Sequence, residues 1–306
     1  MRQTCLEKIY LLAQEDDRIV FIGSDLGPGV MSKFRNEFPT RFFMEGISEQ
    51  HIIGMAAGLA MDGFIPFVNT IASFLSRRCF EQIAIDLCLH DLPVRLIGNG
   101  GGLVYAPLGP THQAIEDIGI FRTLPNMTVV APCDSDEMIR LIDVTVDWPS
   151  PMYIRLAKGG DKIVSQSGYG FEIGKAILLA NPGSVLFVTT GITTQRALLA
   201  SKILKEQQIS SGVLHMHTIK PFDHKSLITN VDKTDLIVTI EEHVLTGGLG
   251  SAVAETICDH GLNKRILRMG LPDSFVSGYG SQDDLMNDFG LSAENIAKCV
   301  KSNLGC

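Results

Sequence analysis

Strand-like and helix-like segments alternate along most of this chain, and this alternation limits the possible fold more than any other feature. β-rich runs at 18–26, 65–74 and 92–102 are each followed by a helix-like or glycine-rich segment. Neighbouring parallel strands need a long crossover connection, which is usually a helix. The alternation therefore predicts an α/β fold in which helices cover both faces of doubly wound parallel sheets.

A polar, glycine-rich segment at 158–174 interrupts the alternation. It predicts a linker or a short hairpin. Beyond it, the run SVLFVTTGI (184–192) predicts a strand, and residues 193–208 predict a helix with threonine caps. A length of 306 residues also suits about two domains. We therefore expect one domain over residues 1–165 and a second over 175–306.

Charge and cysteine usage exclude several classes of partner. The net charge is −8 and no long basic stretch occurs, so neither nucleic acid nor a membrane surface is an expected partner. The N-terminus predicts an amphipathic helix and not a signal peptide. Seven scattered cysteines without CxxC spacing indicate neither a metal site nor a disulfide framework. The expected location is a reducing cytoplasm.

The stretch 41–58 carries the acid Glu49 at the start of a helical segment rich in small and apolar residues. A carboxylate in such surroundings is costly unless it is paired or functional. The simpler alternative is a helix-start charge, with Ser48 and Glu49 acting as cap and dipole partner. Gly54 and Gly58 indicate close packing of this helix, within the chain or against a partner's helix.

Two further segments have residue types suited to a site where strands end. The loop expected at NTIASF (69–74) carries Phe74, and GPTHQ (109–113) carries His112. Each also has an ordinary explanation, as a core aromatic or a hydrogen-bonded loop histidine. The glycine cluster at 98–102 does not form a GxGxxG fingerprint, and GGLGSAVAE (247–255) lacks the Lys-Ser/Thr of a phosphate loop.

The order of EGISEQH (45–51), NTIASF and GPTHQ resembles that in the thiamine-diphosphate enzymes of the transketolase family. The resemblance continues through TIKPFD (218–223), EEHVLTGGLGSAVAE (241–255), GLPDSFV (270–276) and YGSQDDL (279–285), so it covers essentially the whole chain. It implies a pyrimidine-binding domain followed by a transketolase C-terminal domain.

The resemblance implies a role for each matching residue. Glu49 would hydrogen-bond a ring nitrogen of the cofactor's aminopyrimidine, and would hold or share a proton there. Phe74 would pack on that ring, and Ile71 stands where many relatives have a second aromatic. His112 would contact the substrate and transfer protons. Glu49 and His112 are thus the expected catalytic residues, and Glu49, Phe74 and Ile71 the expected cofactor-binding residues.

The same resemblance implies an altered substrate site. Arg2 matches an arginine that reaches the substrate phosphate, and Lys158 stands near a second such arginine. A lysine pairs with phosphate without the bidentate geometry of arginine. Leu108 stands where many transketolases have a sugar-contacting Asp, and Gly100 near a second family histidine. The expected substrate therefore differs from the usual pentose and hexose phosphates.

The family holds the diphosphate and Mg²⁺ in another domain, through a GDG…N motif that this chain lacks. The expected partner is therefore an N-terminal transketolase subunit in an α₂β₂ assembly, with the cofactor at an interface. A start at Met1 on a matching helix favours a natural subunit over a fragment.

The expected function is transfer of a two-carbon ketol unit between sugars or sugar phosphates. Three alternatives remain open. One is the β subunit of a 2-oxo acid dehydrogenase decarboxylase component, although such subunits usually carry His-Ser-Gln in place of Thr-His-Gln. A deoxyxylulose-phosphate-synthase-like enzyme is another. The last is a non-catalytic binding protein that keeps the fold.

Overall fold

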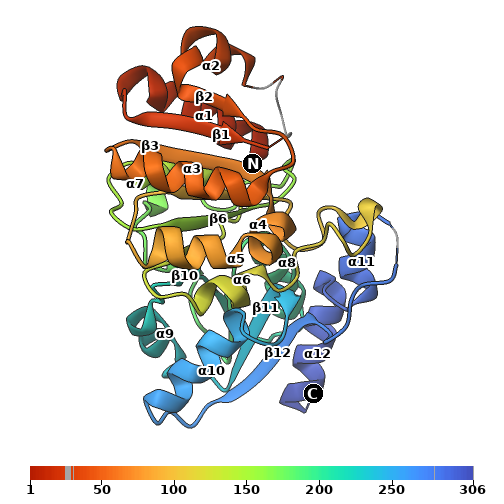
Figure 1. Cartoon of the computed structure of the whole chain (residues 1–306). Coiled ribbons are helices and arrows are strands. Elements are labelled where there is room, and N and C mark those ends of the chain that lie inside the picture. The colour runs from red at the N-terminus through yellow and green to blue at the C-terminus, as the bar shows by residue number, and fades with distance from the viewer. Residues whose placement is uncertain (25–28, 30, 279, 306) are drawn as a thin grey trace.

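The chain folds into two twisted sheets, each with helices on both faces (Figure 1). The computed structural model describes residues 1–24, 29, 31–278 and 280–305. The predicted α/β class with two doubly wound domains is confirmed. Among the described residues, no helix combines the length and the apolar character needed to cross a bilayer.

The first sheet has the strand order β10-β5-β6-β4-β3-β1-β2 and is parallel except for the β10–β5 pair. Its strands are β1 (Ile19–Gly23), β2 (Phe42–Met44), β3 (Ile65–Ile71), β4 (Arg95–Asn99), β5 (Thr128–Val130), β6 (Met152–Leu156) and β10 (Thr218–Lys220). Successive strand residues serve opposite faces. Ile22 and Val68 contribute to one core and Phe21 and Phe67 to the other.

Seven α-helices, two 3₁₀ turns (η1 and η3) and one π-helical segment (η2) accompany this sheet in the described residues. They are α1 (Arg2–Glu15), α2 (Ser32–Glu37), η1 (Pro39–Arg41), α3 (Glu49–Met61), α4 (Ala72–Arg78), α5 (Phe80–Gln82), η2 (Ile83–Cys88), η3 (Ala106–Leu108), α6 (Asp117–Arg122) and α7 (Ser135–Thr145). Phe74 therefore lies within a helix and not in the predicted loop, because α4 begins directly after β3.

The second sheet has the order β12-β11-β8-β9-β7, with an antiparallel β7–β9 pair. Its strands are β7 (Ile177–Ala180), β8 (Val185–Thr189), β9 (Ser211–His215), β11 (Leu236–Val244) and β12 (Arg265–Leu271). The helical elements of this half are η4 (Ser167–Tyr169), α8 (Thr193–Glu206), α9 (His224–Val231), α10 (Leu249–Asp259), α11 (Gln282–Asp288) and α12 (Ala293–Leu304). Leu204 and Ile296 belong to the core on one face, and Leu227 and Val253 to the core on the other.

One local prediction in this half is wrong, and one of the two alternatives for the segment 158–174 is excluded. Helix α8 has Ile192 at its N-cap position and no side-chain cap. The hydroxyl of Thr193 donates instead to the carbonyls of Thr190 and Ile240, and that of Thr194 bonds the His215 ring. The segment 158–174 forms no hairpin; its only regular element is η4.

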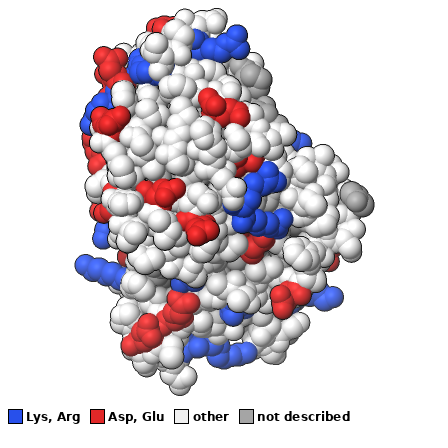
Figure 2. All heavy atoms as spheres, viewed as in Figure 1, with Lys and Arg blue, Asp and Glu red and all other residues white. Residues whose placement is uncertain are grey.

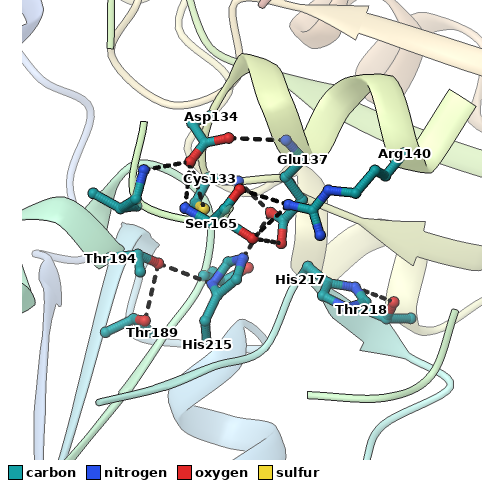
Figure 3. Close-up of polar contacts among 12 residues, drawn as sticks. Cys133, Asp134, Glu137, Arg140, Ser165, Thr189, Thr194, His215, His217 and Thr218 are labelled. Atoms are coloured by element: carbon teal, nitrogen blue, oxygen red, sulfur yellow. Dashed lines mark hydrogen bonds and ion pairs between the residues drawn. The ribbon is translucent and has the colours of Figure 1, made fainter. Parts of the chain in front are cut away.

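A buried polar cluster joins the two halves of the chain (Figure 3). Glu137 of α7 accepts hydrogen bonds from the backbone N–H of Cys133 at 2.7 Å and from the hydroxyl of Ser165 at 3.1 Å. It also pairs with Nε2 of His215 on β9 at 2.8 Å. Asp134 accepts from the backbone N–H of Ser165 at 2.7 Å. The linker is thereby tied to the first half at Glu137, where His215 of the second half also binds.

Candidate active site

Glu49 is the first residue of α3, and its side chain is 2% exposed. One carboxylate oxygen, Oε2, pairs with Nη1 of Arg78 at 2.9 Å. The other, Oε1, is buried and has no hydrogen-bond partner among the described residues. Ser48 makes no side-chain cap, since its hydroxyl donates to the Glu45 carbonyl at 2.7 Å. The capping part of the simpler alternative is therefore wrong, although Glu49 does lie in the first turn of α3. Glu49 is a buried acid with one unsatisfied oxygen.

Helix α4 brings an aromatic ring to this acid. Phe74 lies one turn before Arg78, and the guanidinium carbon of Arg78 is 3.9 Å from the centre of the Phe74 ring. Arg78 thus contacts both Glu49 and Phe74. Ile71, the last residue of β3, is buried just ahead of the helix. Sequence reasoning missed Arg78, although the four-residue spacing from Phe74 could have indicated it, since such residues share a helix face.

His112 approaches Phe74 from the loop before α6. The two ring centres are 5.3 Å apart, and Nδ1 of His112 lies 2.9 Å from the Thr111 hydroxyl. Arg77 anchors this loop, because it donates to the carbonyls of Pro110 and Gln113 at 3.3 and 2.9 Å. The structure therefore brings Glu49, Phe74 and His112 together through a continuous set of contacts.

The opposite end of the loop is held by Arg155 of the first half and by Glu242 of the second half. Arg155 of β6 pairs with Asp117 at 2.9 Å and donates to the backbone carbonyls of Ala114 and Glu242. Glu242 accepts from the backbone N–H of Leu103 at 2.8 Å. Burial disfavours the charge of Arg155, but the neighbouring Asp117 and Glu242 raise the pKa of its guanidinium above the usual range. Burial raises the pKa of Glu242.

Two of the residues predicted to contact the substrate, Arg2 and Lys158, line a separate cavity of about 300 Å³, whereas the third, His112, does not. Its wall contains Arg2, Asn99, Gly100, Val104, Tyr105, Pro107, Leu108, Ala157 and Lys158. The expected cations Arg2 and Lys158 therefore line the same cavity as Gly100 and Leu108, where many transketolases have a histidine and an aspartate. Glu49, Phe74, Ile71 and His112 do not line this cavity.

Asn99 and Gly100 give the cavity its floor at the end of β4. Nδ2 of Asn99 donates to Oδ1 of Asn69 at 2.6 Å, while its own Oδ1 is buried without a partner among the described residues. Gly100 has φ +72°, and a Cβ there would lie 2.1 Å from the Tyr105 ring. The ring occupies the space that any side chain at residue 100 would need. Sequence reasoning missed both Asn99 and Tyr105.

Cys133, Glu137 and His215 are a further set of potential ligands, with ligand-type atoms within 4.8 Å of one another (Figure 3). Glu137 and His215 already have hydrogen-bond partners within the chain, and the Cys133 thiol donates to Asp134. Burial and the nearby Glu137 and Asp134 raise the pKa of the Cys133 thiol above its usual range, which opposes the thiolate that binds metals. Hydrogen bonding accounts for this set without a metal.

Charges are mixed on the face seen in Figure 1. Figure 2 shows scattered acidic side chains there and basic side chains only in small groups. This face offers no continuous basic strip for a polyanion.

Comparisons with known proteins show the family to which both halves of the chain belong. The transketolase pyrimidine binding domain matches residues 1–160, and the transketolase C-terminal domain matches residues 174–296. A putative transketolase C-terminal section of Methanocaldococcus jannaschii is 36% identical over 99% of this chain and 96% of its own length. A 6-deoxy-6-sulfo-D-fructose transketolase subunit of Clostridium sp. (strain MSTE9) is 36% identical over 98% of this chain and 93% of its own. A solved structure described as a split gene transketolase, inactive beta4 tetramer, is 35% identical, has a TM-score of 0.90, and is aligned over 98% of this chain and 97% of its own.

Proposed function

Because this chain belongs to the transketolase family, we propose that it is the C-terminal subunit of a thiamine-diphosphate-dependent transketolase. The proposed reaction moves a two-carbon ketol unit between sugars or sugar phosphates. The observation that carries the proposal is the meeting of Glu49, Phe74 and His112, which come from three separate segments. Such convergence of an acid, an aromatic ring and an imidazole suits a cofactor-assisted proton transfer.

The residues present fit an aminopyrimidine ring. Glu49 offers a buried carboxylate oxygen without a partner among the described residues, and Phe74 offers an aromatic surface beside it. A ligand that stacks on Phe74 and hydrogen-bonds Glu49 would satisfy that oxygen. When bound, thiamine diphosphate supplies the nucleophilic carbon and the electron sink for breaking a C–C bond.

The chain's own residues then have separate tasks. Glu49 holds a proton at the ring nitrogen, and Phe74 and Ile71 orient the ring. His112 is half-buried, and its Nδ1 is occupied by the Thr111 hydroxyl. This bond orients the imidazole for binding a substrate oxygen and moving a proton to or from it.

The cavity lined by Arg2 and Lys158 is proposed to hold the substrate's anionic end. Arg2 and Lys158 are exposed cations on its wall. The oxygen of Asn99 without a partner in the described part of the chain is an acceptor, so it suits a sugar hydroxyl and not the anion. Leu108 adds apolar surface where a sugar-contacting Asp is usual in the family. A phosphate or a sulfonate fits these cations, and one relative is described as acting on a sulfonated sugar.

The partner is proposed to be an N-terminal transketolase subunit that holds the diphosphate and Mg²⁺, within an α₂β₂ assembly. Two relatives of nearly the same length are described as a C-terminal section and a subunit. Gly54 and Gly58 are exposed, and a Cβ at either would meet no described atom within 4 Å. The expectation that these two glycines pack closely against another part of the chain is therefore wrong.

An open glycine face on α3 suits a helix from a second copy of this chain. Met61, exposed to 59% at the end of the same helix, adds apolar surface beside that face. All the described cysteines are free, as a reducing cytoplasm would require.

Reconstitution with the N-terminal subunit tests the proposal. The complex, supplied with thiamine diphosphate and Mg²⁺, should transfer a ketol unit between sugar phosphates. The Glu49→Gln variant should lose at least about 100-fold in kcat, since removal of a positioned acid–base group typically costs about 10²–10⁴ in rate. Unchanged activity of Glu49→Gln, or release of CO₂ from a 2-oxo acid as the main reaction, would contradict the proposed function.

A further inference from the structure

Arg78 lies between the two residues proposed to hold the aminopyrimidine ring. Its Nη1 donates to Oε2 of Glu49 at 2.9 Å, and its guanidinium carbon is 3.9 Å from the centre of the Phe74 ring. A guanidinium is planar, donates hydrogen bonds in its plane and stacks on aromatic faces. It therefore makes the same two kinds of contact that an aminopyrimidine would make with Phe74 and Glu49.

We propose that Arg78 is a placeholder for the aminopyrimidine ring in the free chain. Its guanidinium occupies Glu49 and one face of Phe74, and it has to leave before the ring can take both contacts. Arg78 thereby lowers the affinity of the chain for the pyrimidine end of the cofactor. This inference rests on the proposed function, because it assigns the same two residues to the ring.

The exposure of the two partners indicates which one moves. The Arg78 side chain is 43% exposed, whereas that of Glu49 is 2% exposed. A pair with one partner in water contributes little to stability, so solvent can replace the Arg78 contacts at small cost. The backbone is held in place, since Nε2 of Gln50 donates to the Arg78 carbonyl at 2.8 Å. Only the side chain has to rotate away.

The adjacent Arg77 is held in place by more contacts than Arg78. It pairs with Glu116 at 2.5 Å and donates to the carbonyls of Pro110 and Gln113. Its bonds hold the His112 loop. Arg78 has one ion pair among the described residues, and that pair is with the proposed cofactor ligand itself. The two arginines thus differ in how easily they are displaced.

The second oxygen of Glu49 supports a ligand at this place. Oε1 is buried and unpartnered among the described residues, so the Arg78 pair satisfies only half of the carboxylate. An unsatisfied buried oxygen is costly. A bound ring that supplies its own donor to Oε1 would remove this cost, which supports a ligand beside Glu49, and Arg78 competes with that ligand for the face of Phe74.

The test measures binding of 4-amino-5-hydroxymethyl-2-methylpyrimidine to the full chain by calorimetry. This fragment carries no diphosphate, so its binding does not need the partner subunit's site. Arg78→Met should bind it about tenfold more tightly than the native chain, equivalent to about 1.4 kcal/mol. Arg35→Met removes an equally positive, exposed arginine on α2 and should leave the affinity unchanged.

The Arg78→Gln variant and the NMR signal of Arg78 give two independent checks on this result. Arg78→Gln should also bind the fragment more tightly, and thermal melts should show both variants folded. In the native chain, the Arg78 Nε–H resonance, assigned through its loss in Arg78→Met, should shift to that of a solvated arginine when the fragment is added. Equal or weaker binding by both Arg78 variants, or no binding by either, would overturn the placeholder. Absence of ketol transfer by the reconstituted native complex would instead count against the proposed function, whatever the fragment shows.

Discussion

At the scale of single residues, the close contact of Gly100 with Tyr105 and the charges of two cations characterise the cavity proposed for the substrate. Gly100 is held at φ +72° with the Tyr105 ring against it, and Asn99 keeps one oxygen free of partners among the described residues. Arg2 and Lys158 provide the positive charge. These two cations support the proposal that the cavity holds an anionic group of the substrate.

Lys158→Ala should raise KM for a phosphorylated substrate by about tenfold and leave kcat nearly unchanged, because a charge-assisted contact contributes about 1.5 kcal/mol to uniform binding. Steady-state kinetics of the reconstituted complex measures this. Lys162→Ala is the matched control, since Lys162 is an exposed lysine outside this cavity. An equal rise in KM for both variants would argue against a specific phosphate contact.

Gly100→Ala should destabilise the chain by about 2 kcal/mol, because an L-residue is strained at this φ and its Cβ would clash with Tyr105. Urea unfolding gives the free energy. Gly168→Ala serves as control, since a Cβ at Gly168 would meet no described atom within 4 Å and its φ is not left-handed. The Gly100→Ala, Tyr105→Ala double variant should recover the part of the loss that is due to the clash; no recovery would mean that backbone strain alone is responsible.

At the scale of elements, β10 belongs to the first sheet although it lies beyond the linker. Thr218 and Lys220 pair antiparallel with β5, and the backbone N–H of Ala131 donates to the His217 carbonyl at 2.7 Å. An unpaired edge strand promotes association with other chains. We therefore propose that a stable first domain needs residues 218–220 in addition to residues 1–165.

A fragment of residues 1–165 should accordingly associate more strongly than the full chain, because β5 loses its edge partner. Sedimentation at several protein concentrations measures this. Adding a peptide with the sequence of residues 216–223 in excess should reduce the association, whereas a scrambled peptide should not. A fragment that stays monomeric and as cooperative in unfolding as the full chain would show that β10 is dispensable.

At the scale of the whole molecule, buried ionisable groups join the two halves. Burial lowers the pKa of His217 to about 4, and the ring stacks on Phe171 with centres 4.1 Å apart. Burial by itself would raise the pKa of Glu137. The paired His215, with smaller effects of His217 and the Cys133 backbone, has the larger influence and lowers that pKa to about 2. Both shifts make the association of the halves sensitive to acid.

Stability should fall as the pH is lowered from about 6.5 to about 4, because in this window the unfolded chain binds a proton at His217 that the folded chain excludes. The loss from this group reaches at most roughly 3 kcal/mol. Unfolding free energies measured across this range should show a flatter slope for His217→Phe, which keeps a ring against Phe171. His260→Phe, at an exposed histidine, should keep the native slope. Identical slopes in His217→Phe and the native chain would exclude this histidine as the cause.

Much of the fold and part of the site could be predicted from local patterns. The alternating segments predicted the α/β class, and the resemblance of the short motifs to the transketolase family implied Glu49, Phe74 and His112. The threonine caps of α8 were wrong, because the Thr193 hydroxyl donates to a carbonyl of a distant strand. The loop around Phe74 was wrong, because α4 begins directly after β3. Strand β10 was not assigned to the first sheet, since its partner β5 lies far away in the sequence.

The sequence by itself determined which elements form and which family they belong to, because periodicity and motif spacing are properties of neighbouring residues. Only the tertiary structure decided what those residues contact. The pairing of Glu49 with Arg78 depends on how α3 packs beside α4, and the shared cavity of Arg2 and Lys158 depends on where α1 and the end of β6 meet. Such contacts join residues far apart in the chain, so no local pattern contains them.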